Sequence, residues 1–232
     1  FNKNILNNLY MEETIYSNFD GKKIPLEIKL DDFFKKKENG IFIELGANDG
    51  LRQSNTAFLE KSRGWKGLLI EPSRKAFELC KTNRPNSICI HCACVEPEIA
   101  LHHENVRGDW VEGRLMGSIG GKRLKKIMPG QKMTNAPAKT LESIIDNNEY
   151  KNIDLLSLDV EGYELNVLKG LNLDKYRPTY MLIEVYRVDY DKILNFLESK
   201  NYKLHSNFTG YNKIDNPGWD GTHNDFLFID EK

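Results

Sequence analysis

The chain has 232 residues, of which 40% are hydrophobic and 29% are charged, a composition typical of a folded globular protein. Its 33 basic and 34 acidic residues leave a net charge of −1, so no global attraction to nucleic acid or to a membrane surface is expected. No apolar run approaches the roughly 18–20 residues that a transmembrane helix needs.

The first 39 residues are predicted to be an N-terminal extension followed by a helix that packs on the core. Residues 1–25 are polar and rich in Asn, which favours a loosely packed extension. In residues 25–40 apolar side chains recur at helical spacing up to Gly40, so a helix that ends at this glycine is expected. The chain begins with Phe, and we expect it to be an excised part of a longer protein.

From residue 40 onward, short apolar segments alternate with segments of helical periodicity. The expected strands are residues 41–45, 67–72, 87–95, 153–160, 179–186, 202–208 and 224–230. The expected helices are residues 54–64, 73–83, 140–148, 163–170 and 190–201. This alternation is typical of an α/β fold in which a mostly parallel sheet carries helices on both faces. We therefore expect one domain over residues 40–232.

Residues 106–139 interrupt the alternation. They are rich in glycine, Lys and Arg and show no sustained periodicity. A segment this long without clear structure is usually a functional loop or a disordered one, and we expect a loop or lid beside the functional site. Its basic residues either face an anionic partner or form a solvated turn. These residues are Lys122, Arg123, Lys125 and Lys126.

The four cysteines are predicted to be buried free thiols. Three of them, with His91, form "CIHCAC", which offers metal ligands. However, no second ligand pair follows at zinc spacing, and "SICIHCACV" has the composition of a buried strand. Reduced thiols fit a cytoplasmic location.

The stretch "IFIELGANDG" places two glycines and an acid directly after an apolar strand. In doubly wound sheets, ligands bind beyond the carboxyl ends of the strands. A dinucleotide site favours G-x-G-x-x-G, whereas this loop reads E-x-G-x-x-x-G, from Glu44 through Gly46 to Gly50. An acid here would repel a diphosphate but suits the cationic amino group and sulfonium of S-adenosylmethionine. Glu71 ends the next strand, where a carboxylate can accept hydrogen bonds from ribose hydroxyls.

Two blocks of the sequence resemble a known family. "IELGANDGLRQSNTAFLEKSRGWKGLLIEPSRKAF" and "LDVEGYELNVLKG" are similar to the signature blocks of FkbM-type methyltransferases, and "THNDFLFID" resembles their closing strand. The resemblance implies a class I methyltransferase (Rossmann-like) fold with seven strands, the last antiparallel. It also implies S-adenosylmethionine as cofactor and a hydroxyl oxygen of a sugar or polyketide-type product as acceptor, with residues 106–139 on the acceptor side.

The resemblance also implies a set of cofactor-binding residues. Those expected around the methionine part are Glu44, Gly46, Asn48, Asp49 and Gly50, and Ser54 and Asp159 are also expected at the cofactor site. Those expected around the ribose and the adenine are Glu71, Pro72, Ala93, Cys94 and Val95.

Acids at neighbouring strand ends are the candidates for catalysis. Asp159 ends the fourth strand, Glu161 follows it, and Glu184 ends the next strand. Such a cluster is costly without a cation or a shared proton, so we expect Mg²⁺ or Mn²⁺ at Asp159 and Glu184, with Asp159 and Glu161 acting in catalysis. In the alternative reading, Asp159 orients the cofactor, Glu161 caps the following helix and Glu184 pairs with Arg187.

His223 is a second candidate for the general base. It lies in "NPGWDGTHNDFLF", just before the closing strand, and histidine titrates near neutral pH. The alternative is a surface histidine in a loop. Trp219 or Trp110 can stack on a sugar or serve as a core aromatic.

The sequence therefore predicts an S-adenosylmethionine-dependent O-methyltransferase. The expected acceptor is a sugar, such as the deoxysugar rhamnose in a glycan, or a glycosylated metabolite, and we expect fusion to or association with glycosyltransferase domains. Two alternatives stay open: a catalytically silent binding domain of a glycan-assembly protein, and an NAD-dependent oxidoreductase.

Overall fold

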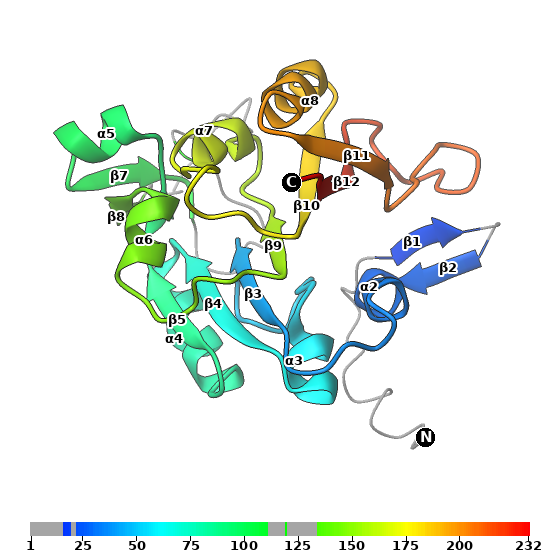
Figure 1. The fold of residues 1–232 in the computed structure, drawn as a ribbon, viewed down its shortest axis with the longest axis horizontal. Coiled ribbons are helices and arrows are strands. Elements are labelled where there is room, and N and C mark those ends of the chain that lie inside the picture. The colour runs from blue at the N-terminus through cyan, green and yellow to red at the C-terminus, as the bar shows by residue number, and fades with distance from the viewer. Residues whose placement is uncertain (1–15, 20–21, 111–118, 120–133) are drawn as a thin grey trace.

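The structure is a computed structural model, and it describes residues 16–19, 22–110, 119 and 134–232 (Figure 1). Among these residues no helix is both long and apolar enough to cross a bilayer. The basic residues predicted to face a partner, 122–126, lie outside the described residues.

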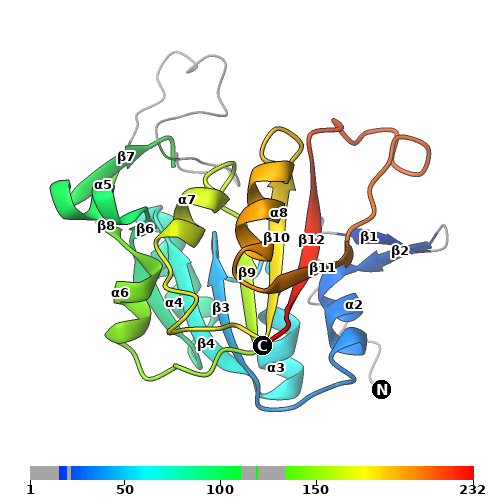
Figure 2. The same ribbon diagram turned by 45° about the horizontal axis from the view of Figure 1, so that its top comes forward.

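A seven-stranded sheet forms the centre of the fold, in the order β11-β12-β10-β9-β3-β4-β5. In chain order its strands are β3 (Ile41–Leu45), β4 (Lys66–Glu71), β5 (Ile88–His91), β9 (Leu155–Leu158), β10 (Tyr180–Tyr186), β11 (Tyr202–Asn207) and β12 (His223–Asp230). Five neighbouring strands of this sheet, β5, β4, β3, β9 and β10, pair in parallel. Strand β12 is antiparallel to both β10 and β11. Figure 2 shows β3, β9, β10 and β12 side by side. Strand order reverses between β3 and β9, which is where ligands bind in such sheets.

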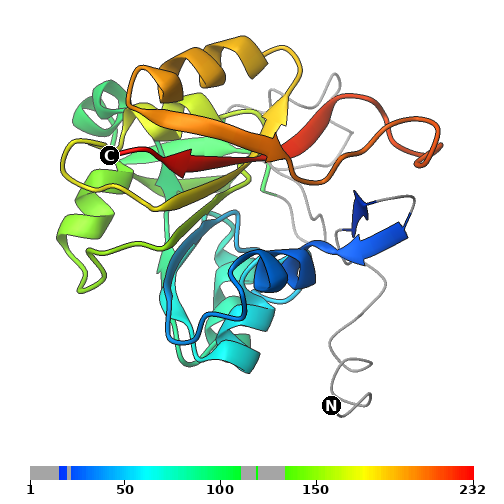
Figure 3. The ribbon, with the colours of Figure 1, turned by 45° about the vertical axis from the view of Figure 1, so that its right-hand side comes forward.

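Helices cover both faces of this sheet (Figures 1 and 3). The helices are α2 (Leu26–Phe33), α3 (Ala57–Arg63), α4 (Arg74–Asn83), α5 (Pro97–His102), α6 (Leu141–Asp146), α7 (Glu164–Lys169) and α8 (Tyr190–Glu198). Leu30 and Leu59 from α2 and α3 pack with Phe42 on one face. Ile144 and Val167 from α6 and α7 pack on the other face with Ile43. Because strand residues alternate in direction, Phe42 and Ile43 reach opposite layers.

Two predicted segments in the middle of the chain differ from the expectation. The run 87–95 is not one strand: β5 ends at His91, and β6 (Ala93–Cys94) pairs with β8 (Thr134–Lys139) in a small sheet of order β6-β8-β7. The segment 106–139 is therefore structured at both ends, with β7 (Asn105–Gly108) antiparallel to β8.

The N-terminal region also differs from the expectation. A hairpin of β1 (Tyr16–Phe19) and β2 (Lys22–Pro25) stands where a loose extension is expected. The helix predicted to reach Gly40 ends earlier, at Phe33, because Lys35, Lys36 and Asn39 have positive φ angles. A left-handed backbone cannot continue a right-handed helix.

Replacing Glu27 with Gln should stabilise the protein increasingly as pH rises. Glu27 is buried on α2 and its Oε2 accepts a hydrogen bond from the N–H of Phe58 (3.2 Å). Burial raises its pKa to about 7, so the folded state loses stability as pH rises from the unfolded-state pKa through this value. The free energy of unfolding of Glu27→Gln should exceed that of wild type by a margin that grows by about 2 kcal/mol between pH 5 and pH 8, measured by urea unfolding.

A matched control is Glu78→Gln, which changes an exposed carboxylate on α4. The difference between its free energy of unfolding and that of wild type should not grow with pH. A constant difference for Glu27→Gln across the same pH range would contradict the prediction.

Candidate active site

A cavity lies at the carboxyl ends of β3, β4 and β9, at the point where strand order reverses. It holds about 860 Å³ of space, part of it open to solvent. Four segments contribute its polar and small side chains. They are the loop after β3 (Gly46, Asn48, Arg52, Gln53), the β4–α4 junction (Glu71, Pro72, Ser73, Ala76), the β5–β6 crossing (Cys92, Ala93, Cys94) and the loop after β9 (Asp159, Val160, Glu161, Tyr163).

The glycines of the loop after β3 allow close backbone contacts. Gly46 has a φ of 79°, and a Cβ there would lie 2.0 Å from the carbonyl oxygen of Asp159. Gly50 has a φ of 82°, and a Cβ there would lie 2.7 Å from Cγ of Arg84. Any other residue would be strained and would clash at either position. The two glycines therefore let this loop lie against both the end of β9 and helix α4.

The polar residues of the same loop fix its shape. Asp49 Oδ1 accepts hydrogen bonds from the N–H groups of Leu51 (2.9 Å) and Arg52 (2.8 Å). Asn48 has a positive φ and donates its backbone N–H to Glu71 Oε2 (2.9 Å). The Asn48 Nδ2 atom is buried, and within the described part of the chain it has no hydrogen-bond partner. A buried donor without a partner costs about 1–3 kcal/mol, so this amide favours a bound acceptor group.

Glu71 presents its carboxylate to the cavity from the end of β4. Oε1 accepts a hydrogen bond from the N–H of Ser73 (2.7 Å), and Oε2 accepts the one from Asn48. Each carboxylate oxygen has a further lone pair, so both can still accept from a ligand. Burial raises the pKa of Glu71 to about 7. The group is therefore a strong acceptor above neutral pH and a weaker one below it.

Glu44 lies elsewhere than the sequence suggests. Its side chain is 3% exposed and does not line the cavity. Oε2 accepts hydrogen bonds from the hydroxyls of Ser54 (2.9 Å) and Thr56 (2.6 Å), and Oε1 accepts one from the N–H of Asn55 (2.8 Å). The carboxylate thus holds the start of α3 against β3. Ser54 Oγ also accepts a hydrogen bond from the N–H of Ala57 (3.1 Å), the first residue of α3.

Arg84 is a residue of this region that the sequence reasoning missed. It is 0% exposed and follows α4. Its Nε donates to Glu60 Oε2 (2.8 Å), Nη1 donates to the carbonyl of Gly50 (2.9 Å) and to Ser54 Oγ (3.1 Å), and Nη2 donates to Thr56 Oγ1 (2.9 Å). A buried guanidinium is stable only when its donors are satisfied in this way. Arg84 therefore ties α4 to the glycine loop.

Three carboxylates meet beside the cavity: Asp159 after β9, Glu184 on β10 and Glu164 at the start of α7. One oxygen of each lies within 4.8 Å of the others. The sequence predicts Asp159 and Glu184 as metal ligands but misses Glu164. Glu164 Oε1 accepts hydrogen bonds from the N–H groups of Val160 (3.1 Å) and Gly162 (2.9 Å). Burial, with a smaller effect from Asp159, raises the pKa of Glu164 to about 7.

His223 adjoins this cluster from the far side of β10. Its Nε2 lies 3.3 Å from Glu184 Oε1, and its Nδ1 lies 2.8 Å from Thr222 Oγ1. Glu161 accepts a hydrogen bond from the hydroxyl of Tyr186 (2.7 Å), whose ring centroid is 5.3 Å from that of His223. No ion pair joins Glu184 to Arg187 within the described residues. The cluster and the histidine together could bind a divalent cation or accept a proton.

The predicted residues thus fall into two groups. Those that line the cavity are Gly46, Asn48, Glu71, Pro72, Ala93, Cys94, Asp159 and Glu161. Those that do not are Glu44, Asp49, Gly50, Ser54, Val95, Glu184 and His223. Trp110 also lines the cavity, whereas Trp219 lies near His223. Tyr163 and Arg52 are lining residues that the sequence reasoning missed, since neither position has a composition or spacing signal.

Comparison with known proteins gives a family match. The family model described as the methyltransferase FkbM domain matches residues 44–204. No curated protein matches the chain by sequence. The TrmK structure from M. capricolum, in complex with S-adenosyl-homocysteine, shares 11% identity and a TM-score of 0.50, covering 88% of this chain and 68% of that chain.

Two further solved structures match at lower TM-scores. A TehB-like SAM-dependent methyltransferase from Corynebacterium glutamicum has a TM-score of 0.46 at 10% identity, covering 89% of this chain and 87% of that chain. A SAM-dependent methyltransferase from Geobacter sulfurreducens, in complex with S-adenosyl-L-homocysteine, has a TM-score of 0.46 at 9% identity, covering 89% of this chain and 90% of that chain.

Proposed function

Because the chain belongs to the FkbM methyltransferase family, whose fold it has, we propose that it methylates a hydroxyl oxygen of a sugar. The predicted class I methyltransferase fold is confirmed, with seven strands and an antiparallel β12. The sugar would stand in a glycan or a glycosylated metabolite. The observation that carries the proposal is the carboxylate cluster beside the cavity, since a sugar hydroxyl must lose its proton to attack a methyl group.

The residues of the cavity fit S-adenosylmethionine. Glu71 can accept hydrogen bonds from the ribose hydroxyls, and the buried amide of Asn48 can donate to the methionine part. Ala93 and Cys94 give a small, flat wall suited to the adenine. When bound, the cofactor supplies an electrophilic methyl group on its sulfonium. Gly46 and Asn48 would then hold it at the edge nearest Asp159, because that loop contacts the end of β9.

The carboxylate cluster would prepare the acceptor hydroxyl. Asp159, Glu164 and Glu184 offer the oxygen ligands that Mg²⁺ or Mn²⁺ prefers, and three close carboxylates are stable together only with a cation or shared protons. A bound cation would lower the pKa of a sugar hydroxyl. His223, whose Nε2 lies 3.3 Å from Glu184 Oε1, is the alternative proton acceptor.

Two rival functions make different predictions. A silent binding domain would bind S-adenosylmethionine without transferring its methyl group. An NAD-dependent oxidoreductase needs a third glycine to admit a pyrophosphate, and the loop after β3 lacks it. Isothermal titration with S-adenosylmethionine and with NAD separates the two cofactors. A methyl-transfer screen over simple sugars, with Mg²⁺, Mn²⁺ or a chelator, then separates enzyme from binding domain.

Glu71→Gln should lower the affinity for S-adenosylmethionine by about 10–100-fold, because hydrogen bonds to a charged group contribute about 1.5–3 kcal/mol. The pKa of Glu71 is raised to about 7, so the wild-type affinity should fall as pH drops below 7 and the carboxylate is protonated. The variant should show little of this pH dependence. Titration calorimetry at pH 6 and pH 8 measures both effects, with the exposed Glu78→Gln as control. Equal affinities of wild type and Glu71→Gln at pH 8 would remove Glu71 from the cofactor site.

A further inference from the structure

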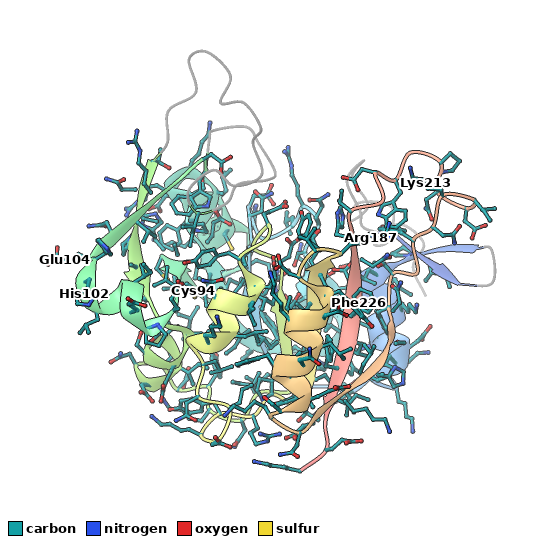
Figure 4. All side chains as sticks on the ribbon, turned by 90° about the horizontal axis from the view of Figure 1, so that it is seen from above. Cys94, His102, Glu104, Arg187, Lys213 and Phe226 are labelled. Atoms are coloured by element: carbon teal, nitrogen blue, oxygen red, sulfur yellow. The ribbon has the colours of Figure 1, made fainter. Side chains whose placement is uncertain are left out.

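A second cavity lies on the other side of the β10 end, away from the cofactor cavity. It holds about 600 Å³ of space, part of it open to solvent, and is lined by β10, the start of α8, the loop before β12, and β12 itself. Its side chains include Tyr190, Trp219, Phe226, Arg187 and His223. In Figure 4, Arg187 lies near Phe226, while Cys94 of the cofactor cavity lies well away from both.

The walls of this second cavity are aromatic, and their positions are fixed. Tyr190 and Phe226 pack with ring centroids 5.1 Å apart. Trp219 donates its Nε1–H to the carbonyl oxygen of His223 (2.9 Å), and its ring is half-buried. Aromatic rings present apolar faces that pack against the C–H face of a pyranose. A cavity walled in this way is therefore suited to a ring-shaped, partly apolar ligand.

The second cavity adjoins the carboxylate cluster through one contact. His223 lines the cavity, and its Nε2 lies 3.3 Å from Glu184 Oε1. A ligand seated there would thus have one edge next to the residues proposed to prepare the acceptor hydroxyl. An acceptor in this cavity could reach the carboxylate cluster through the side of His223 and Glu184.

One arginine, Arg187, lines the second cavity. Arg187 is exposed, and within the described residues no acid lies within ion-pair distance of it. Lys213 lies on the loop before β12, outside the lining of this cavity (Figure 4). An arginine that is not engaged by a protein carboxylate is the residue best suited to bind a phosphate or carboxylate group of a ligand.

From these observations we propose that the second cavity binds the acceptor and that the acceptor is a sugar carrying an anionic group, a phosphate or a carboxylate. The aromatic walls would hold the sugar ring, and Arg187 would hold the anion. Arg187 is then a specificity-determining residue. This inference rests on the proposed function, because it places the methylated sugar beside the carboxylate cluster.

The test uses the indole N–H signal of Trp219 in the ¹⁵N NMR spectrum, assigned by Trp219→Phe. The probes are glucose 1-phosphate, glucuronate, glucose and inorganic phosphate. At least one charged sugar should shift this signal with about tenfold higher affinity than glucose, as expected for one charge-assisted contact. Arg187→Gln should abolish this preference. The control Arg74→Gln, on exposed α4, should keep it.

The outcomes separate the sources of the anion and the two proposals. A response to glucose 1-phosphate alone or to glucuronate alone supports the inference and identifies the group. Three results would overturn the inference: equal affinities for charged and neutral sugars, a preference for charged sugars that survives Arg187→Gln, or no response to any sugar. Inorganic phosphate that binds as tightly as the charged sugars would show that the sugar ring is not recognised. Titration of the same samples with S-adenosylmethionine tests the proposed function: if the cofactor binds and the sugars do not, only the inference about the second cavity fails.

Discussion

Asp159→Asn should lower methyl transfer by roughly 10²–10⁴-fold, the range seen when a proton acceptor or its equivalent is removed from an active site. The variant keeps the size of the side chain and removes its charge. Asp159 both lines the cofactor cavity and belongs to the cluster with Glu164 and Glu184. With one carboxylate of the proposed cation site neutral, the Mn²⁺ affinity expected from the proposed function should fall by at least about tenfold, measured by calorimetry. The affinity for S-adenosylmethionine should change less than turnover does.

The control is Asp154→Asn, at the opposite end of the same strand. Asp154 accepts hydrogen bonds from the N–H of Ile41 (2.9 Å) and from Lys37 (2.5 Å), far from the carboxyl ends of the strands. Its turnover should match wild type. If Asp159→Asn retains full activity, the residue has no part in the mechanism. If the affinity for the cofactor falls as much as turnover, Asp159 orients the cofactor and the catalytic role passes to Glu164, Glu184 or His223.

Much of the central sheet is predictable because its strands are buried on both sides. β3, β4, β9 and β10 are apolar runs closed by polar residues, and their ends fall within a residue or two of the expected ones. The cavity follows from this arrangement, since parallel strands bring their carboxyl ends to one edge. Gly46, Asn48, Glu71 and Asp159 therefore meet as expected. The antiparallel final strand came from the family resemblance.

The orientation of side chains was harder to predict. Glu44 shares the direction of Phe42, which packs with α2 and α3, whereas Ile43 and Leu45 point to the other face. A strand buried on both faces has no polar side, so its sequence does not show which face meets which helix. The sequence therefore places Glu44 at the cofactor, whereas its carboxylate holds residues 54–56, just before α3.

The smaller elements depend on partners distant in the sequence. Nothing in "SICIHCACV" marks the point at Cys92 where the chain leaves the main sheet. The segment "TNAPAK" is polar and contains Pro137, yet it forms β8 because β6 and β7 lie on either side. By contrast, the residue pair Asp20–Gly21 stands between β1 and β2 and is common in hairpin turns, so that hairpin could have been predicted.

Glu164 and Arg84 show two different reasons for a missed site residue. Glu164 stands in "DVEGYE", which resembles the family block, but the first turn of a helix often carries an acid for capping alone. Only the fold shows that its carboxylate also faces Asp159 and Glu184. Arg84 stands before Pro85 at a helix end, a position usually exposed. Its burial follows from the packing of α4 against the glycine loop.

Arg84→Met should destabilise the protein by about 3–5 kcal/mol, because it leaves the Glu60 carboxylate buried without its cation. Arg84 is 0% exposed and Glu60 is 6% exposed, and their charged atoms are 2.8 Å apart. The same change removes the hydrogen bond to the carbonyl oxygen of Gly50, so the loop that contacts the end of β9 loses its attachment to α4. Urea unfolding measures the first effect, and the affinity for S-adenosylmethionine measures the second.

Two further variants make this prediction testable even if Arg84→Met folds poorly. Arg74→Met, on the exposed side of the same helix, breaks an ion pair with Glu78 (2.9 Å) and should cost less than about 1 kcal/mol. In Arg84→Met/Glu60→Gln the guanidinium and the Glu60 carboxylate are both gone, so part of the lost stability should return; the buried Glu44 carboxylate, 3.8 Å from Arg84 Nη1 in the wild type, still lacks its cation. The affinity for S-adenosylmethionine should stay low in the double variant, because the contact to Gly50 is still missing. Recovery of both stability and affinity would mean that Arg84 only neutralises Glu60. Recovery of stability alone would mean that it also positions the loop, and that the cofactor site depends on a residue outside its own lining.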